Sequence, residues 1–164
     1  EMPRRPLPLA ALLLAGALLL PPVLARPLPA QAGAARTAAD TATPVVDVRQ
    51  PTVLALYAVP PDSLLRSDDG LASLLDDFMY YWADARPRLT RLGVAPLEQA
   101  LDWRARRVGL RMDGRVWPVE LPADSGAVGY VLAAPGRAPR LIPRLLVDEE
   151  LADSARAAFR RPAP

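Results

Sequence analysis

Few residue types in this chain could carry out chemistry. The sequence has 20 basic residues, all of them arginine, and it has no lysine, histidine or cysteine. The missing types rule out thiol nucleophiles, disulfides, Ser-His-Asp catalysis and zinc sites built from histidine or cysteine. Any catalysis or binding must therefore use carboxylates, tyrosine, serine, threonine, arginine or the backbone. We expect a protein that is not a thiol-dependent or histidine-dependent enzyme.

Carboxylates are densest in two aspartate doublets, Asp68-Asp69 and Asp76-Asp77, with Asp62 nearby. Such oxygens could bind a hard cation such as calcium, or a pair of them could act as acid and base. A calcium loop places its ligands at every second position, and the doublets do not follow that spacing. We therefore interpret them as helix-start anions and a solvated helix face. No metal or cofactor is predicted.

An aromatic run follows the second doublet and contains Tyr80 and Trp82. Trp82 falls on the apolar stripe of a predicted helix, whereas Tyr80 lies more than a quarter-turn away from that stripe. An exposed tyrosine flanked by Asp76, Asp77 and Asp84 would form an apolar centre inside a rim of acceptors, as interface hot spots do. These four residues are the candidate partner-binding site, and a basic partner would suit them. If a later hairpin covers this flank, Tyr80 is instead a core residue.

Serines and arginines supply two weaker candidates. Ser63 and Ser67 follow the first predicted strand, where ligands bind in open α/β sheets, but no base is available to activate them and capping explains both. Arg104, Arg106 and Arg107 could clamp a phosphate or a carboxylate. Because no glycine-rich phosphate loop accompanies them, a solvated strand edge is the simpler interpretation.

The positive net charge of +2 comes from the beginning of the chain. Residues 1–32 contain three arginines and one glutamate, whereas 17 arginines balance 17 acidic residues from Gly33 onward. The main part of the chain therefore has no excess of positive charge for DNA or anionic lipid. We predict neither a nucleic-acid partner nor a membrane partner.

Residues 1–32 are typical of a bacterial secretion signal. A basic start precedes an apolar run of 12 residues from Leu9 to Leu20, and Pro21-Pro22 then leads to small residues. We expect cleavage after Ala32, with a second site after Ala25. A membrane span needs about 20 apolar residues, so an uncleaved anchor is the less favoured alternative. The sequence predicts an exported protein, either periplasmic or extracellular.

The rest of the chain divides into a linker, a domain and a tail. Residues 33–51 are rich in Ala, Thr, Pro and Asp, which predicts a flexible linker. Residues 52–161 are expected to form one domain, and residues 162–164 a tail. Thr52 to Val59 is apolar nearly throughout, as expected of a strand that is covered on both faces.

The next pattern predicts a long helix that Ser67 caps and Gly93 ends, with a kink or break near Asp84 ahead of Pro87. Residues 95–107 fit either a short helix or a strand, and we favour a strand.

Two hairpins and a closing helix follow. Asp113-Gly114 predicts a two-residue turn that sets Arg107 opposite Glu120, with one face of the hairpin apolar. Pro135-Gly136 predicts a type II turn between two further strands. The last helix is expected to begin at Asp148, which would cap it.

This order of elements resembles the thioredoxin-like fold, in which a βαβ unit precedes an antiparallel ββα unit. The resemblance covers Thr52 to Arg161 and implies a single α/β domain. Thr52–Ala58 looks like the first strand of that fold, Val128–Ile142 like its late hairpin and Val147–Phe159 like its closing helix.

The motifs of that family are missing from the chain. At the position of its Cys-x-x-Cys pair, this chain reads Val59-Pro60-Pro61-Asp62-Ser63-Leu64. At the position of its cis-proline, the chain reads Gly126-Ala127-Val128. The resemblance therefore implies a scaffold without a redox centre.

Together these observations predict a non-catalytic exported envelope protein that binds a partner protein or a small ligand. One alternative is a periplasmic enzyme that uses the carboxylates of Asp76 and Asp77 with Tyr80, with or without a divalent cation. A further alternative is a structural component of the envelope. The identity of the partner and the oligomeric state are left open.

Overall fold

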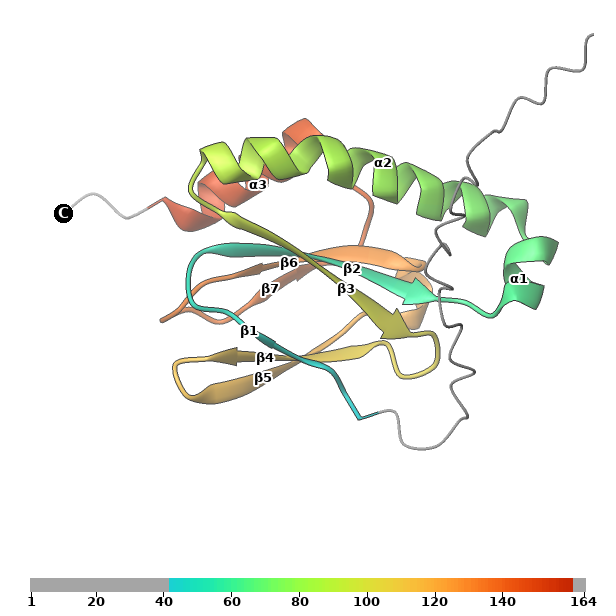
Figure 1. Ribbon diagram of the computed structural model, residues 1–164, viewed down its shortest axis with the longest axis horizontal. Helices are drawn as coiled ribbons and strands as arrows, with labels where there is room; N and C mark the ends of the chain where they lie inside the picture. Colours follow the sequence, from blue (N-terminus) through green and yellow to red (C-terminus); the bar gives the residue numbers. More distant parts are fainter. Residues whose placement is uncertain (1–41, 161–164) are drawn as a thin grey trace, which may run out of the picture. The chain divides into compact units, whose positions relative to one another are not determined.

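The computed structural model describes residues 42–160, and these residues form three layers (Figure 1). Helices α2 (Asp69–Arg91) and α3 (Asp148–Phe159) cover one face of a four-stranded sheet, and a three-stranded sheet covers the other face. The predicted secretion signal and the predicted tail lie outside the described residues. The α/β class that the sequence predicted is confirmed.

The four-stranded sheet has the strand order β3-β2-β6-β7, with bounds Ala95–Asp102, Thr52–Val59, Val128–Ala133 and Arg140–Ile142. Strand β2 is parallel to β3 and antiparallel to β6, which is antiparallel to β7. Val53 and Ala55 of β2 pack in the helix-side core, whereas Leu54 and Leu56 pack against the other sheet. All four are completely buried, so the predicted covering of this strand on both faces is confirmed.

The three-stranded sheet has the order β1-β4-β5, with bounds Val45–Asp47, Arg107–Met112 and Arg115–Glu120. The prediction of a flexible linker over residues 33–51 is wrong at β1, which runs parallel to β4 and pairs Val45 with Gly109. Val46 and Val48 are the reason, because both pack in the core between the two sheets.

The Asp113-Gly114 hairpin has the predicted register. Met112 pairs with Arg115 and Arg107 pairs with Glu120. Both turn residues have the positive φ that a type I′ turn requires, 50° at Asp113 and 72° at Gly114. The inward face of the hairpin is buried and includes Val108, Leu110, Met112, Val119 and Leu121.

The second hairpin, between β6 and β7, also has its predicted turn. The Arg137 N–H donates to the Ala134 carbonyl at 3.2 Å, which closes a four-residue turn. Gly136 has φ 76°, as the third position of a type II turn requires. A short 3-10 helix, η1 (Ala123–Ser125), precedes this hairpin.

Helix α2 begins one residue later than expected. Asp68, not Ser67, is its cap, and the Asp68 carboxylate accepts from the Leu71 N–H at 2.9 Å. Ser67 instead ends the short helix α1 (Asp62–Ser67), where its hydroxyl donates to the Leu64 carbonyl. The predicted break near Asp84 is wrong, because α2 continues through Pro87. Pro87 lies on the exposed side of the helix, where water can satisfy the carbonyl that proline leaves without a donor.

The prediction that Asp148 caps α3 is also wrong. Asp148 is the first residue of that helix, and Val147 occupies the cap position without a side-chain hydrogen bond. The Asp148 carboxylate instead forms an ion pair with Arg88 of α2, with Arg88 Nε and Asp148 Oδ2 2.7 Å apart. The Asp148 carboxylate therefore binds an arginine on another helix instead of capping α3.

Residues 95–107 contain the strand that we favoured, over Ala95–Asp102. The part after Asp102 is a turn instead, because the Asp102 carboxylate accepts the N–H groups of Arg104 and Ala105, each at 2.9 Å. These hydrogen bonds lower the pKa of Asp102 below its ordinary value of 3.8. Among the helices of residues 42–160, none combines the length and apolar character needed to cross a membrane.

Candidate binding surface on helix α2

Tyr80 lies on the side of α2 that faces away from the core. The buried residues of this helix are Phe78, Trp82, Ala85 and Leu89. At about 100° per residue, Tyr80 is about half a turn from their mean direction. Its side chain is 64% exposed, the largest exposed fraction among the exposed large hydrophobic residues of the described part. The predicted exposure of Tyr80 is confirmed.

Trp82 occupies the core and shows why its neighbour Tyr80 does not. The Trp82 indole N–H donates to the Glu98 carboxylate of β3 at 3.0 Å, and the Trp82 ring is 1% exposed. Its ring centroid lies 6.3 Å from that of Tyr130, and Phe78 lies 5.4 Å from the same Tyr130 ring. Because these rings fill the space between α2 and the sheet, the alternative in which a hairpin covers Tyr80 is wrong.

The three predicted aspartates surround Tyr80 on the exposed surface of the helix. Asp76 and Asp77 lie one turn before Tyr80 and Asp84 lies one turn after it, and all three are exposed. Within residues 42–160, none of the three carboxylates forms an ion pair. The structure therefore brings all four predicted site residues together on one helix face.

Charge is unevenly distributed along this part of the chain. Residues 62–84 contain six aspartates and one arginine, whereas residues 85–91 contain three arginines and no acidic residue. Met79, next to Tyr80, is 43% exposed, and the rings of Tyr80 and Tyr81 meet edge to face with centroids 5.5 Å apart. The surface has an aromatic centre, an acidic majority and a basic end. The candidate site predicted from the sequence ends at Asp84 and lacks the basic end, although the same helical period continues through Pro87 to Arg91.

This surface is poorly suited to catalysis. Asp76 and Asp77 are consecutive, so their side chains leave the helix about 100° apart and do not converge on one point. They and Tyr80 are exposed on a helix face that water can reach freely. Across residues 42–160 no group of three acidic side chains is placed to share a metal ion. The three side chains are therefore not arranged around one shared reaction centre.

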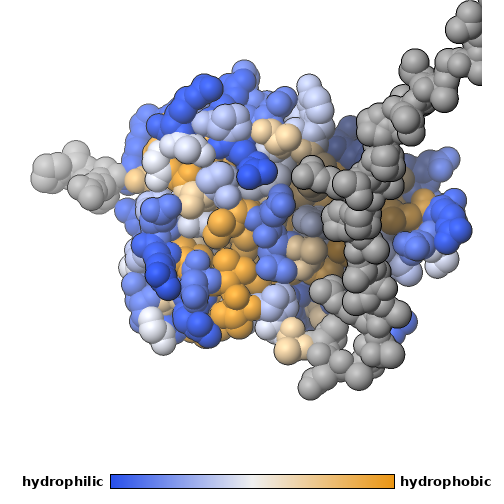
Figure 2. Space-filling model, in the orientation of Figure 1, coloured by the Kyte–Doolittle hydropathy of each residue, from blue (hydrophilic) through white to orange (hydrophobic). Residues whose placement is uncertain are grey.

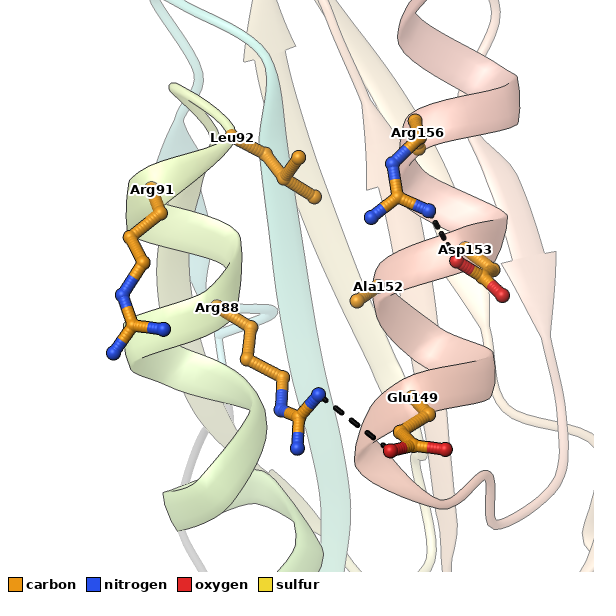
Figure 3. A pocket seen from close by; sticks show the side chains of 7 residues that line it. All are labelled: Arg88, Arg91, Leu92, Glu149, Ala152, Asp153 and Arg156. Atoms are coloured by element: carbon orange, nitrogen blue, oxygen red, sulfur yellow. Dashed lines mark hydrogen bonds and ion pairs between the residues drawn. The ribbon is translucent and has the colours of Figure 1, made fainter.

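A groove runs between α2 and α3 (Figure 3) with a volume of about 360 Å³. Leu92 and Ala152 contribute its apolar part, and charged side chains line the rest. Arg88 forms ion pairs with Asp148 at 2.7 Å and Glu149 at 3.7 Å, while Arg156 forms one with Asp153. Arg91 also lines the groove and has no ion pair within residues 42–160, whereas the other charged side chains of the lining are all paired. The groove is therefore best explained as the seam where the two helices pack.

The two remaining candidates are structural. Ser63 lies exposed in α1, beside no histidine or lysine because the chain has neither. The three arginines do not form a clamp. Arg107 pairs with Glu120 at 2.9 Å, and Arg104 is exposed, whereas Arg106 is 7% exposed and turned inward.

Arg106 links the turn after β3 to the segment between β5 and β6. Its guanidinium donates to the carbonyls of Pro122 at 3.1 Å and Gly126 at 2.7 Å, and it lies 4.8 Å from the centroid of the Trp103 ring. Nothing in the sequence indicates this role, because Arg106 is one of three nearby arginines and is chemically identical to the other two. Its positive φ of 50° appears only in the structure.

We compared the chain with protein-family models, with curated proteins and with solved structures, and found no match in any of the three.

Proposed function

We propose that this protein is an exported, non-catalytic binding protein and that it contacts its partner through the outer face of α2. The observation that carries the proposal is the position of Tyr80, 64% exposed and surrounded by Asp76, Asp77 and Asp84, none of which has an ion-pair partner within the described residues. Tyrosine is enriched at interface hot spots because it adds a large contact area and a hydroxyl. Unpaired aspartates around it supply acceptors for a partner's donors.

The chemistry of this face favours a protein partner with basic side chains. A small ligand is usually bound in a concave site that buries most of its surface. The outer face of α2 is a single helix surface, and the groove described above lies to one side of it. An envelope protein that presents arginine or lysine to the aspartates fits the face better than a small ligand does.

We propose that the domain is a variant of the thioredoxin-like scaffold. Support comes from the β2-α2-β3 unit, from the later β6-β7-α3 unit and from the position of β2 between β3 and β6. The β1-β4-β5 sheet on the second face is the main departure. Residues 59–64 leave β2 and enter α1 without a cysteine, so the scaffold carries no thiol chemistry.

Export rests on the secretion signal of residues 1–32. The expected cleavage after Ala32 would give a mature protein that begins at Gly33. N-terminal sequencing of the secreted or periplasmic protein tests this directly. Recovery of the intact Leu9–Leu20 segment in a membrane fraction would favour the uncleaved anchor instead.

The binding proposal can be tested by site-specific photocrosslinking in the cells that make the protein. A photoreactive amino acid replaces Tyr80 in one variant and Val116 in the control variant. Val116 is 53% exposed but lies on β5, in the three-stranded sheet, which covers the face of the four-stranded sheet that α2 does not cover. We expect a discrete crosslinked adduct from position 80 and none of the same size from position 116.

Charge neutralisation then links the adduct to the aspartates. Asp76→Asn, Asp77→Asn and Asp84→Asn together should weaken the position-80 adduct, because the surface loses three negative charges that attract a basic partner. Equal adducts from positions 80 and 116, or an adduct that the three changes leave intact, would count against this surface.

A further inference from the structure

The outer face of α2 carries a pattern of residues that is complementary to a second copy of the same pattern running in the opposite direction. Five residues of the helix point within about 40° of one common direction; they are Asp76, Tyr80, Ala83, Pro87 and Arg91. All five are exposed. We call them the outer stripe. From its acidic end to its basic end the outer stripe reads acid, aromatic, small residue, proline, base.

Two antiparallel copies of this stripe are complementary. If a two-fold axis passes between residues 83 and 84, Tyr80 of one copy lies opposite Pro87 of the other, and Asp76 lies opposite Arg91. The symmetry makes each pair occur twice. Ala83 lies next to the axis, where its small side chain lets the helices approach each other. Tyr80 can then pack its ring on a proline, and the charged ends can form two ion pairs.

We propose that the partner of the outer stripe is a second copy of this chain, bound through antiparallel α2 helices. This proposal rests on the proposed function, because it names the partner of the same surface. It would give Asp76 and Arg91 the ion-pair partner that neither has within residues 42–160. Residues 76 and 91 are 15 positions apart, or about 22 Å along a helix, so they cannot pair within one chain.

The size of the contact predicts a weak, reversible dimer. A helix of 23 residues is about 34 Å long and about 10–12 Å wide. One helix face therefore offers a footprint of about 400 Å² per copy, roughly half of what a standard stable interface buries on each partner. Association should thus depend on protein concentration, and the ion pairs at the ends should make it weaker at high salt.

Asp84 distinguishes a second copy from a foreign basic partner. It lies beside the proposed axis, so the two Asp84 carboxylates of a dimer come near each other and repel. Asp84→Asn should therefore strengthen association between copies. The same change should weaken binding to a basic protein, because it removes one of the negative charges that attract that partner.

The decisive experiment is sedimentation velocity on the purified full-length chain, from about 10 µM to about 1 mM. We expect the wild-type sedimentation coefficient to rise with concentration toward that of a dimer. Asp76→Arg and Arg91→Asp should each abolish the rise, because each places like charges opposite each other. The double variant should restore it, since the reversed pair is again complementary.

Glu120→Arg is the matched control for the acid reversal. It makes the same change of charge on β5, away from the helix layer, and breaks an exposed ion pair that contributes little to stability. This variant should dimerise like the wild type. A stable fold in every variant is checked by thermal unfolding.

Three results would overturn the proposal. The chain could stay monomeric over the whole concentration range, the single reversals could leave dimerisation intact, or the double variant could fail to restore it. If a position-80 crosslink to a different protein is found while the chain remains monomeric, the proposed function holds and the second copy is ruled out. If neither a crosslink nor a dimer is found, both proposals fail.

Discussion

Replacing Gly129 with alanine tests how tightly the two sheets pack. Gly129 lies in β6 and is buried between Leu121 and the chain that leaves β7. A Cβ atom built there would lie 2.9 Å from Leu121 Cδ1, 3.0 Å from the Ile142 carbonyl oxygen and 3.3 Å from Pro143 Cα. Leu121 is 1% exposed and cannot swing into water, and β7 is held to β6 by hydrogen bonds. The alanine methyl must therefore displace packed atoms.

Overpacking of this kind costs about 1–3 kcal/mol. A change of 1 kcal/mol shifts the melting temperature of a domain of about 120 residues by about 4 °C. We therefore expect Gly129→Ala to melt roughly 4–12 °C below the wild type. Urea unfolding followed by tryptophan fluorescence should give a lower midpoint and an unchanged m value.

Gly109→Ala is a matched control with the same first distance. A Cβ atom at Gly109 would lie 2.9 Å from Val116 Cγ1 and 3.3 Å from Val45 Cγ2. Val116 and Val45 are 53% and 46% exposed, so both can turn toward solvent. We expect a change of stability within about 0.5 kcal/mol. If the two alanine variants were destabilised equally, the reasoning from the freedom of the neighbouring side chains would be refuted.

Three further changes test the turn, the exposed tyrosine and the buried tyrosine. Gly114→Val should lower the free energy of unfolding by at least about 1 kcal/mol, because φ at Gly114 is 72° and valine is strained at a positive φ. An unchanged melting temperature would contradict the predicted turn. Tyr80→Ala should change stability by less than about 0.5 kcal/mol, and a large drop in the unfolding midpoint would place Tyr80 in the core.

Burial raises the pKa of Tyr130 to about 12 from 10.0, so the unfolded chain releases this proton first and stability should fall as pH rises from 10 to 12. Urea unfolding at pH 9 and pH 11 measures this fall in the free energy of unfolding, and Tyr130→Phe should remove the part that is due to Tyr130. The variant should also be less stable by about 1 kcal/mol, because it loses the hydrogen bond from the Tyr130 hydroxyl to the Leu146 carbonyl. An identical pH dependence in both proteins would argue against a buried hydroxyl.

Local signals in the sequence predicted the parts of the fold that neighbouring residues decide. Asp113-Gly114 set the hairpin register because few residue pairs adopt two successive positive φ angles. Helical periodicity separated Tyr80 from Trp82 for a similar reason, since 3.6 residues per turn places them on different sides of one helix. The exposure of the candidate site could therefore be predicted from the sequence.

Features that depend on distant partners could not be predicted in this way. Strand β1 exists because Val45 pairs with Gly109, more than 60 residues later, and three residues alone give no periodic signal. Asp148 looked like a cap because its partner, Arg88, lies on another helix. Arg106 looked like a surface arginine because the carbonyls that accept its hydrogen bonds, in the segment between β5 and β6, come 16 and 20 residues later.

The central position of β2 also restricts when the protein can finish folding. Thr52 at the start of this strand pairs with Ala95 on one side and with Ala133 on the other. A chain emerging from its N-terminus therefore presents an apolar strand with one unpaired edge until β6 follows, and α3 completes the cover later still. Such an edge invites pairing with other chains, and pairings between distant segments form slowly. We therefore expect the nascent chain to be prone to aggregation until β6 and α3 have been synthesised.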